Sequence, residues 1–435
     1  MRRAMMQSDE AKSILTKVIS FSKADHCEAF LYSSTEGSTR IANNAITQNV
    51  AKDDKGLSVR VAFGNRVGSA STNKFTDEAL RAVVERAEQL ARLAQPDTEY
   101  LPPPEPTEYR QSVCYFEATA ETGPEQRADA VCKAISMASK ANVRLAGSFA
   151  TYGSFYAVAN SNGLFAHNSE TSARMVVTAM TDDSSGWAEA WSRDVKQIDP
   201  EGTTQRAVEK ALAARNPREL EPGSYTAVLE PAAVAEMLAF VCWALDAKAA
   251  HEGRSAFSGK EGQRIAAESV TLRSSPTDPL CPTSTFFGDG MPVPDVAWID
   301  RGVLSNLSYS RFWAQKTGHP FTGQPVNMIM DGTDASVEEL VSGVEKGVLV
   351  TRFWYIRHVD PMRLLLTGMT RDGLYWIEGG KVQYPLKNLR FNESAIDMLA
   401  QVEAIGRPSL TGDYIPALVP PIVVRDFSFS SKTLF

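Results

Sequence analysis

The stretch from Leu229 to Gly262 constrains the fold of this chain more than any other segment. It opens with Leu229-Glu230-Pro231, and proline at a first helical position costs nothing because that N–H has no partner within a helix. From 231 to 250 the sequence predicts a helix that is apolar around nearly its whole circumference. One face carries Val234, Leu238, Val241 and Leu245. Such a helix belongs in a core or an obligate interface rather than on a wet surface.

The predicted helix is followed by a loop in which the polarity changes and glycine recurs. The loop contains Ser255-Ala256-Phe257-Ser258-Gly259-Lys260-Glu261-Gly262. A Leu-Glu-Pro start, a long apolar helix and this tail together resemble the TldD/PmbA family, also called modulators of DNA gyrase. Further similarities are Gly56-Leu57-Ser58-Val59-Arg60-Val61 and the hairpins at 299–304 and 376–380. The resemblance therefore extends over nearly the whole chain.

The family's zinc motif is missing from this helix. In the peptidase branch, TldD, the helix carries His-Glu-x-x-x-His, which binds zinc. Counted back from Ser255, these positions hold Leu238, Ala239 and Trp243, whose side chains are unsuited to zinc. That branch takes a further cysteine ligand near its C-terminus, whereas no cysteine follows Cys281. The resemblance therefore implies the other branch, TldE or PmbA.

For that branch the resemblance implies no catalytic residue, no metal site and no cofactor, with zinc expected in a TldD-like partner. It also implies that Trp243 stands where the peptidase holds a metal-binding histidine in the middle of the molecule. We therefore expect the indole to fill buried space, so that Trp243→Ala would cost roughly 3–5 kcal/mol.

The patterning of the chain predicts an α+β fold. Residues 1–105 should form an N-terminal mixed α/β domain with an antiparallel sheet, whose boundary could extend to about 220. The proline-rich segment 100–106 is expected to be an extended connector. Residues 106–220 would be a connecting or middle region. Residues 221–435 would form a larger β-rich C-terminal domain around the central buried helix.

Composition excludes several classes of function. The formal net charge is −7 and there is no run of Lys or Arg, which argues against nucleic-acid binding. No apolar run is long enough to span a membrane. The five scattered cysteines include no Cys-x-x-Cys pair, so we expect free thiols and a cytoplasmic location.

The histidines offer weak alternatives for a metal site. His251-Glu252 would need a second histidine four residues after the first to match a zincin motif, but Ser255 stands there. His358 and Asp360 lack a third ligand. We therefore expect His251 to be an exposed loop residue. For His358 the pattern favours a buried, hydrogen-bonded histidine over one that lines a groove near a partner's site. The candidate groove-facing or partner-facing residues are His251, Ser255, Phe257, Gly259 and His358.

The resemblance implies a dimeric assembly that works in proteolysis and peptide maturation. In it, this chain would be the non-metal subunit beside a TldD-like metallopeptidase, and unfolded or extended peptides would be the substrates. Main-chain pairing with an extended peptide would explain a broad specificity. Two alternatives remain open. One is a metallopeptidase in its own right with atypical ligands, and the other is a standalone homodimeric peptide-binding module.

Overall fold

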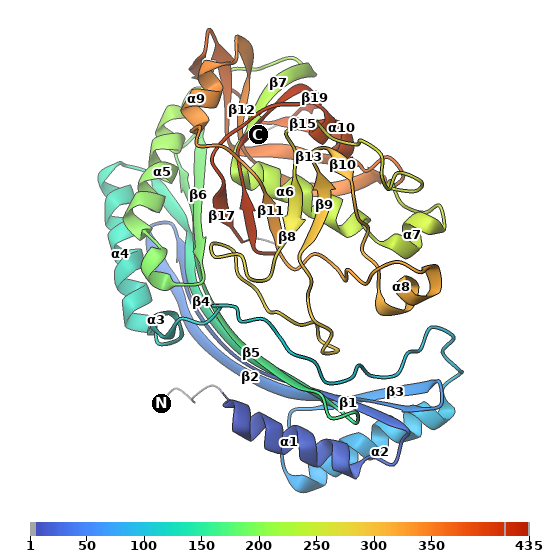
Figure 1. The fold of residues 1–435 in the computed structure, drawn as a ribbon. Helices are drawn as coiled ribbons and strands as arrows, with labels where there is room; N and C mark the ends of the chain where they lie inside the picture. The colour runs from blue at the N-terminus through green and yellow to red at the C-terminus, as the bar shows by residue number, and fades with distance from the viewer. Residues whose placement is uncertain (1–5, 413–414, 434–435) are drawn as a thin grey trace.

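The computed structural model describes residues 6–412 and 415–433. A long, curved antiparallel sheet wraps around one side of the C-terminal part of the chain (Figure 1). Its strand order is β3-β2-β1-β4-β5-β6. The strands are β1 (His26–Ala42), β2 (Ala45–Phe63), β3 (Arg66–Thr72), β4 (Arg144–Asn160), β5 (Phe165–Met180) and β6 (Ser185–Ser192). Because β1 pairs with β4, the first and middle regions of the chain share this sheet.

Helices cover the outer face of the curved sheet (Figure 1). They are α1 (Ser8–Phe21), α2 (Asp77–Leu93), α3 (Glu117–Ala120), α4 (Pro124–Lys140) and α5 (Pro200–Ala213), and a 3-10 turn spans Val195–Gln197. Thr76 caps α2 by accepting the N–H of Ala79, as its position in the sequence predicts. At Gly68 of β3 the backbone of α2 lies so close that a Cβ atom would come within 2.2 Å of the Ala87 carbonyl oxygen. Glycine there is what lets the helix pack directly on the sheet.

Five strands of the C-terminal part close into a ring, because β12 pairs with both β7 and β13. The ring order is β12 (Lys346–Asp360), β7 (Gly223–Leu229), β19 (Ile422–Lys432), β15 (Leu389–Ser394) and β13 (Leu365–Glu378). Strand β14 (Lys381–Pro385) pairs with β13, and β16 (Val402–Ile405) pairs with β19. Phe353, Phe391 and Phe427 are fully buried and in mutual ring contact. They form an aromatic cluster in the core of this part of the chain.

A third sheet lies beside the ring, in the order β10-β9-β8-β11-β18-β17. Its strands are β8 (Leu272–Ser274), β9 (Val296–Asp300), β10 (Val303–Leu304), β11 (Met328–Met330), β17 (Ser409–Thr411) and β18 (Ala417–Val419). The short helices of this part are α7 (Ala247–His251), α8 (Arg311–Thr317), α9 (Val337–Ser342) and α10 (Ala395–Ala400). The predicted fold class is confirmed: an α+β chain whose antiparallel N-terminal sheet precedes a larger strand-rich C-terminal part.

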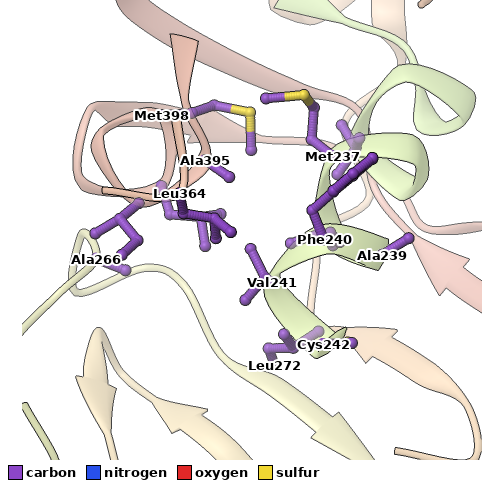
Figure 2. Packing of buried hydrophobic residues seen from close by; sticks show 14 of the residues in the cluster. Met237, Ala239, Phe240, Val241, Cys242, Ala266, Leu272, Leu364, Ala395 and Met398 are labelled. Atoms are coloured by element: carbon purple, nitrogen blue, oxygen red, sulfur yellow. The ribbon is translucent and has the colours of Figure 1, made fainter. Parts of the chain in front are cut away.

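Helix α6 (Pro231–Ala244) is the central buried helix. Every residue from Ala233 to Cys242 is buried. Met237 belongs to one hydrophobic cluster with Met398 of α10 and with Leu364 (Figure 2). The predicted position of this helix in the core is therefore confirmed.

The helix ends earlier than its hydrophobicity predicts, at Ala244 rather than Ala250. The carbonyl of Leu245 accepts the N–H of Ser308 at 2.8 Å, which ties the chain to another segment at this point. Asp246 then caps α7 by accepting the N–H of Ala249 at 2.6 Å. This local capping outcompetes continuation of the apolar helix. None of the helices among the described residues is long and apolar enough to cross a membrane.

Candidate functional site

The three positions aligned with the zinc motif do not share one environment. Leu238 and Ala239 are buried in the core, but Trp243 is 53% exposed. Residues five apart on a helix point about 140° away from each other, so Trp243 leaves the face on which Leu238 packs. The expectation that the indole fills buried space is wrong, and the large stability cost predicted for its removal has no basis in the structure.

These positions do not fit a zinc ion. The side chains of Leu238 and Ala239 carry no nitrogen, oxygen or sulfur, and an indole N–H has no lone pair to give. Elsewhere in residues 6–412 and 415–433, no three His, Cys, Asp or Glu side chains gather as a metal site would require. That the protein holds no metal stays a prediction.

Trp243 instead takes part in an aromatic cluster at the end of α6. Its ring meets Phe240 edge-on, with ring centroids 4.9 Å apart. Phe240 in turn meets His358 of β12 edge-on at 5.1 Å. The candidate His358 therefore lies beside the aligned zinc position of Trp243. It is exposed, so the expectation that it is a buried histidine is wrong.

Two further aromatic side chains are exposed on β12. The pairing of β12 with β13 slips between Trp354 and Arg357, and Tyr355 has a φ of +58°. Such a bulge re-aims side chains, and here the adjacent Trp354 and Tyr355 are 41% and 59% exposed. The guanidinium of Arg371 lies 4.2 Å from the centre of the Trp354 ring, and that of Arg357 lies 4.1 Å from the centre of the Tyr355 ring.

We call the exposed apolar surface formed here the hairpin patch. It consists of Trp243, Trp354, Tyr355, Val359 and Met362. The aromatic contacts of Phe240 and His358 link its α6 and β12 parts. Sequence reasoning missed the β12 part, although one signal was present: two adjacent aromatic residues in a strand are not both buried by simple alternation. Large exposed apolar side chains gathered on neighbouring segments are typical of interaction sites.

His251, the second candidate histidine, lies at the end of α7 in a separate polar cluster. Its Nδ1 accepts the indole N–H of Trp313 at 3.0 Å, and its Nε2 lies 3.3 Å from the hydroxyl of Tyr309. Tyr309 donates to Glu261 at 2.8 Å, and His319 stacks on its ring. Burial and the contact with Glu261 raise the pKa of Tyr309. The nitrogens of His251 are thus engaged within the protein.

The other three candidates lie in the loop after α7. Ser255 is buried, and its hydroxyl donates to the carbonyl of Ala244 at 2.8 Å, so it caps the end of α6. Phe257 is fully buried in the main core. Gly259 is exposed, with a φ of +68° that favours glycine. The family-like tail of this loop therefore anchors α6, and among its three candidates Gly259 is the one at the surface.

A cleft of about 580 Å³ lies between the curved sheet and the loops of the C-terminal part. Its lining includes Arg60 of β2, Asp246, Asp289, Arg311 and Phe321. Carboxylates, guanidinium groups and aromatic rings therefore all reach it. The cleft begins where α6 gives way to α7, and it has room for a short peptide segment.

Comparison with known proteins identifies the family. Residues 27–91, 117–215 and 222–431 match the first, central and C-terminal domain models of the PmbA/TldA metallopeptidases. The chain therefore belongs to the PmbA/TldD family.

The individual relatives have low sequence identity to this chain, but the matches cover much of its length. The structure of TldE from Thermococcus kodakarensis matches with a TM-score of 0.88 at 19% identity, covering 96% of this chain and 99% of that one. Metalloprotease PmbA of Escherichia coli O157:H7 is 20% identical over 93% of this chain and 94% of its own length. A metalloprotease of Methanothermobacter thermautotrophicus is 23% identical, and the match spans 59% of that relative.

Proposed function

We propose that this protein is the non-metal, TldE-like subunit of a cytoplasmic TldD–TldE type metallopeptidase complex that acts in proteolysis and peptide maturation. The observation that carries the proposal is the position of Trp243. An exposed indole, joined through Phe240 to His358 of β12, stands at the aligned position of a zinc ligand. The family's metal position has become part of an apolar surface, and such a surface is suited to contact another protein.

The physical chemistry of peptide hydrolysis supports the same assignment. A zinc peptidase needs a metal to activate water and a carboxylate to move the proton. Leu238 and Ala239 supply neither, and they are packed in the core. The remainder of the family fold is retained around them, so the chain keeps the shape of the enzyme without its reacting groups. We infer that it completes the peptide-binding surface or encloses the active site of a TldD-like partner.

The experiment is a peptide-digestion assay with three samples: this protein, a TldD-like homologue from the same organism, and both together. An unfolded peptide is digested and the fragments are identified by mass spectrometry. We expect no cleavage by this protein, and more cleavage by the mixture than by the homologue alone. Chelator-sensitive cleavage by this chain, undiminished on further purification, would favour the alternative of a metallopeptidase with atypical ligands.

The cleft supports a second candidate, a standalone peptide-binding module. Its size and its mixed charges suit a peptide held without hydrolysis. Binding of a fluorescent unfolded peptide to this protein alone, lost in Arg311→Glu and kept in Trp243→Ala, would favour that function. An unchanged digestion rate when this protein is added to the homologue would favour it further.

A further inference from the structure

The hairpin patch carries an uneven distribution of charge. Between residues 351 and 371 the chain has four arginines and a single carboxylate, that of Asp360, although its overall net charge is −7. The arginines are Arg352, Arg357, Arg363 and Arg371. The Asp360 carboxylate accepts the N–H of Met362 at 2.9 Å, so it is engaged in the hairpin turn. Arg352 and Arg371 lie near Glu236 and Asp372, so the positive charge of the patch rests on Arg357 and Arg363.

The four arginines differ in whether a carboxylate lies near them. Arg352 lies 3.7 Å from Glu236, and Arg371 lies 3.8 Å from Asp372. Arg357 and Arg363 are exposed, and neither forms an ion pair within the part of the chain that the structure describes. Arg357 donates to the neighbouring carbonyl of Ile356 at 2.7 Å and lies over the Tyr355 ring.

The arginine positions matter because they belong to the apolar surface itself. Stacking on Tyr355 holds the Arg357 guanidinium within the patch rather than at a distance from it. Met362, an exposed member of the patch, immediately precedes Arg363. A protein that covers the apolar side chains must therefore also cover these two charges, and burying a charge without a partner is costly.

We propose that the surface that docks on the hairpin patch carries carboxylates opposite Arg357 and Arg363, and that this requirement selects a different chain over a second copy of this one. The inference rests on the proposed function and specifies the chemistry of its partner. In a twofold dimer built on this patch, the patch would face its own copy, so the arginines of both copies would lie in one interface. Juxtaposed like charges oppose such an association, whereas a carboxylate-bearing partner forms charge-assisted hydrogen bonds.

Single-stranded nucleic acid is another polyanion that fits arginines interleaved with aromatic rings. The net charge of −7 opposes it, because long-range repulsion acts on a whole polyanion while a protein partner needs carboxylates at two points. We therefore favour the protein partner. Binding of a single-stranded oligonucleotide to the wild type that disappears in the arginine variants would overturn the proposal.

The test measures two associations in the same variant. Arg357→Gln/Arg363→Gln removes the two charges and keeps polar side chains. Binding to the TldD-like homologue is followed by biolayer interferometry at low and high salt, and self-association is followed by sedimentation velocity. We expect affinity for the homologue to fall at least about tenfold at low salt, with a smaller loss at high salt where screening is strong. We expect self-association to increase, because the apolar patch remains and the like charges are gone.

A matched control separates this effect from a general change of charge. Lys74→Gln/Arg86→Gln removes the same number of charges from exposed residues at and near α2, away from the hairpin patch. This variant should bind the homologue as the wild type does. Circular dichroism and thermal melting of both double variants confirm that they fold.

The outcomes distinguish the two proposals. If the wild type does not associate with the homologue at any salt concentration, the proposed subunit function fails, and this inference fails with it. If the wild type associates but the Arg357/Arg363 variant binds equally well, the function stands and the charge requirement is overturned. A wild-type homodimer that is disrupted by Trp354→Ser at low salt would also overturn it.

Discussion

The indole N–H of Trp313 donates to Nδ1 of His251 across 3.0 Å. An indole nitrogen can only donate, so this imidazole nitrogen carries no proton. The other nitrogen, Nε2, then bears the proton and faces the Tyr309 hydroxyl at 3.3 Å. The bond joins α7 to α8, and it uses the lone pair that a metal would need. His251 is therefore a structural residue in this state.

We predict that His251→Ala lowers the free energy of unfolding by about 1–2 kcal/mol, the range for losing a hydrogen bond and leaving its partner unsatisfied. The loss should be concentrated in α7 and α8. Hydrogen exchange followed by mass spectrometry should show faster exchange in 311–317. His358→Ala is the control, because His358 is exposed on the hairpin, and its stability should stay within about 0.5 kcal/mol of the wild type. Equal effects of the two substitutions would contradict this assignment.

The two ends of α6 should respond differently to truncation. Leu238→Ala opens a cavity in the core and should cost about 2–5 kcal/mol. Trp243→Ala removes a half-exposed ring that meets Phe240 edge-on, and should cost about 1 kcal/mol. Urea unfolding of both variants measures the difference. A loss for Trp243→Ala as large as that for Leu238→Ala would mean that the indole is buried in solution.

Glu393 should make stability depend on pH. Burial raises the pKa of Glu393 from 4.5 to about 7, against the opposing effect of the Ser428 N–H that it accepts at 2.7 Å. The folded chain therefore holds this proton more tightly than the unfolded chain. The contribution to stability is greatest below about pH 4.5 and is lost as the pH rises through about 7.

Glu393→Gln keeps an acceptor for Ser428 and cannot ionise. At about pH 8 this variant should be more stable than the wild type, by up to about 3 kcal/mol. The gain should shrink toward zero at about pH 4.5, and urea titrations across this range measure it. Glu338→Gln, an exposed change on α9, should show no such trend. A wild type that is equally stable relative to Glu393→Gln at both ends of the range would refute the prediction.

The cysteines should differ sharply in reactivity. All five are free, and Cys132 on α4 is the exposed one. Burial raises the pKa of Cys27, Cys242 and Cys281 to about 12, and it also raises the pKa of Cys114. Because the thiolate is the reactive form, iodoacetamide should modify Cys132 first in the native protein and all five in urea. Mass spectrometry of peptides identifies the sites. Rapid native labelling of a second cysteine would show that its surroundings open.

We also expect no stoichiometric zinc in the purified protein. The reason is the donor set: Leu238 and Ala239 replace ligands at the family positions, and Nδ1 of His251 is occupied by Trp313. Elemental analysis after dialysis is the measurement, with the TldD-like homologue as the zinc-containing reference. One zinc per chain that disappears in His251→Ala or His358→Ala would reverse the assignment of these residues.

Sequence patterning predicted the position of α6 well, because a helix that is apolar on all sides must be buried in a core or an interface. It failed at Trp243, whose side chain leaves the face on which Leu238 packs. It also failed at the end of the helix, which depends on Asp246 and Ser308 and which the apolar run does not reveal. The long strands were harder still. Strands β1 and β2 run for 17 and 19 residues, and their paired distal parts are polar. Backbone hydrogen bonds between the strands hold those polar parts in the sheet, and a search for hydrophobic alternation cannot detect such pairing.

The β12 part of the hairpin patch could not be predicted from the sequence for a related reason. Trp354 and Tyr355 are both exposed because β12 slips against β13 and Tyr355 takes a positive φ. A shift of one residue in a ladder exchanges the faces of a strand. Its position depends on the partner strand as well as on β12, so no pattern within residues 346–360 alone determines it.

The ring of five strands also affects how the chain folds while it is being synthesised. Strand β7 pairs with β12 and with β19, and β19 also pairs with β15. During synthesis, β7 leaves the ribosome long before β19, the strand that joins it to β15, whereas β15 leaves only shortly before β19. Until residues 422–432 emerge, both present open edges, and open edges invite pairing with other chains. The ring therefore stays open, and its edge strands stay available for wrong pairing, until β19 has been made.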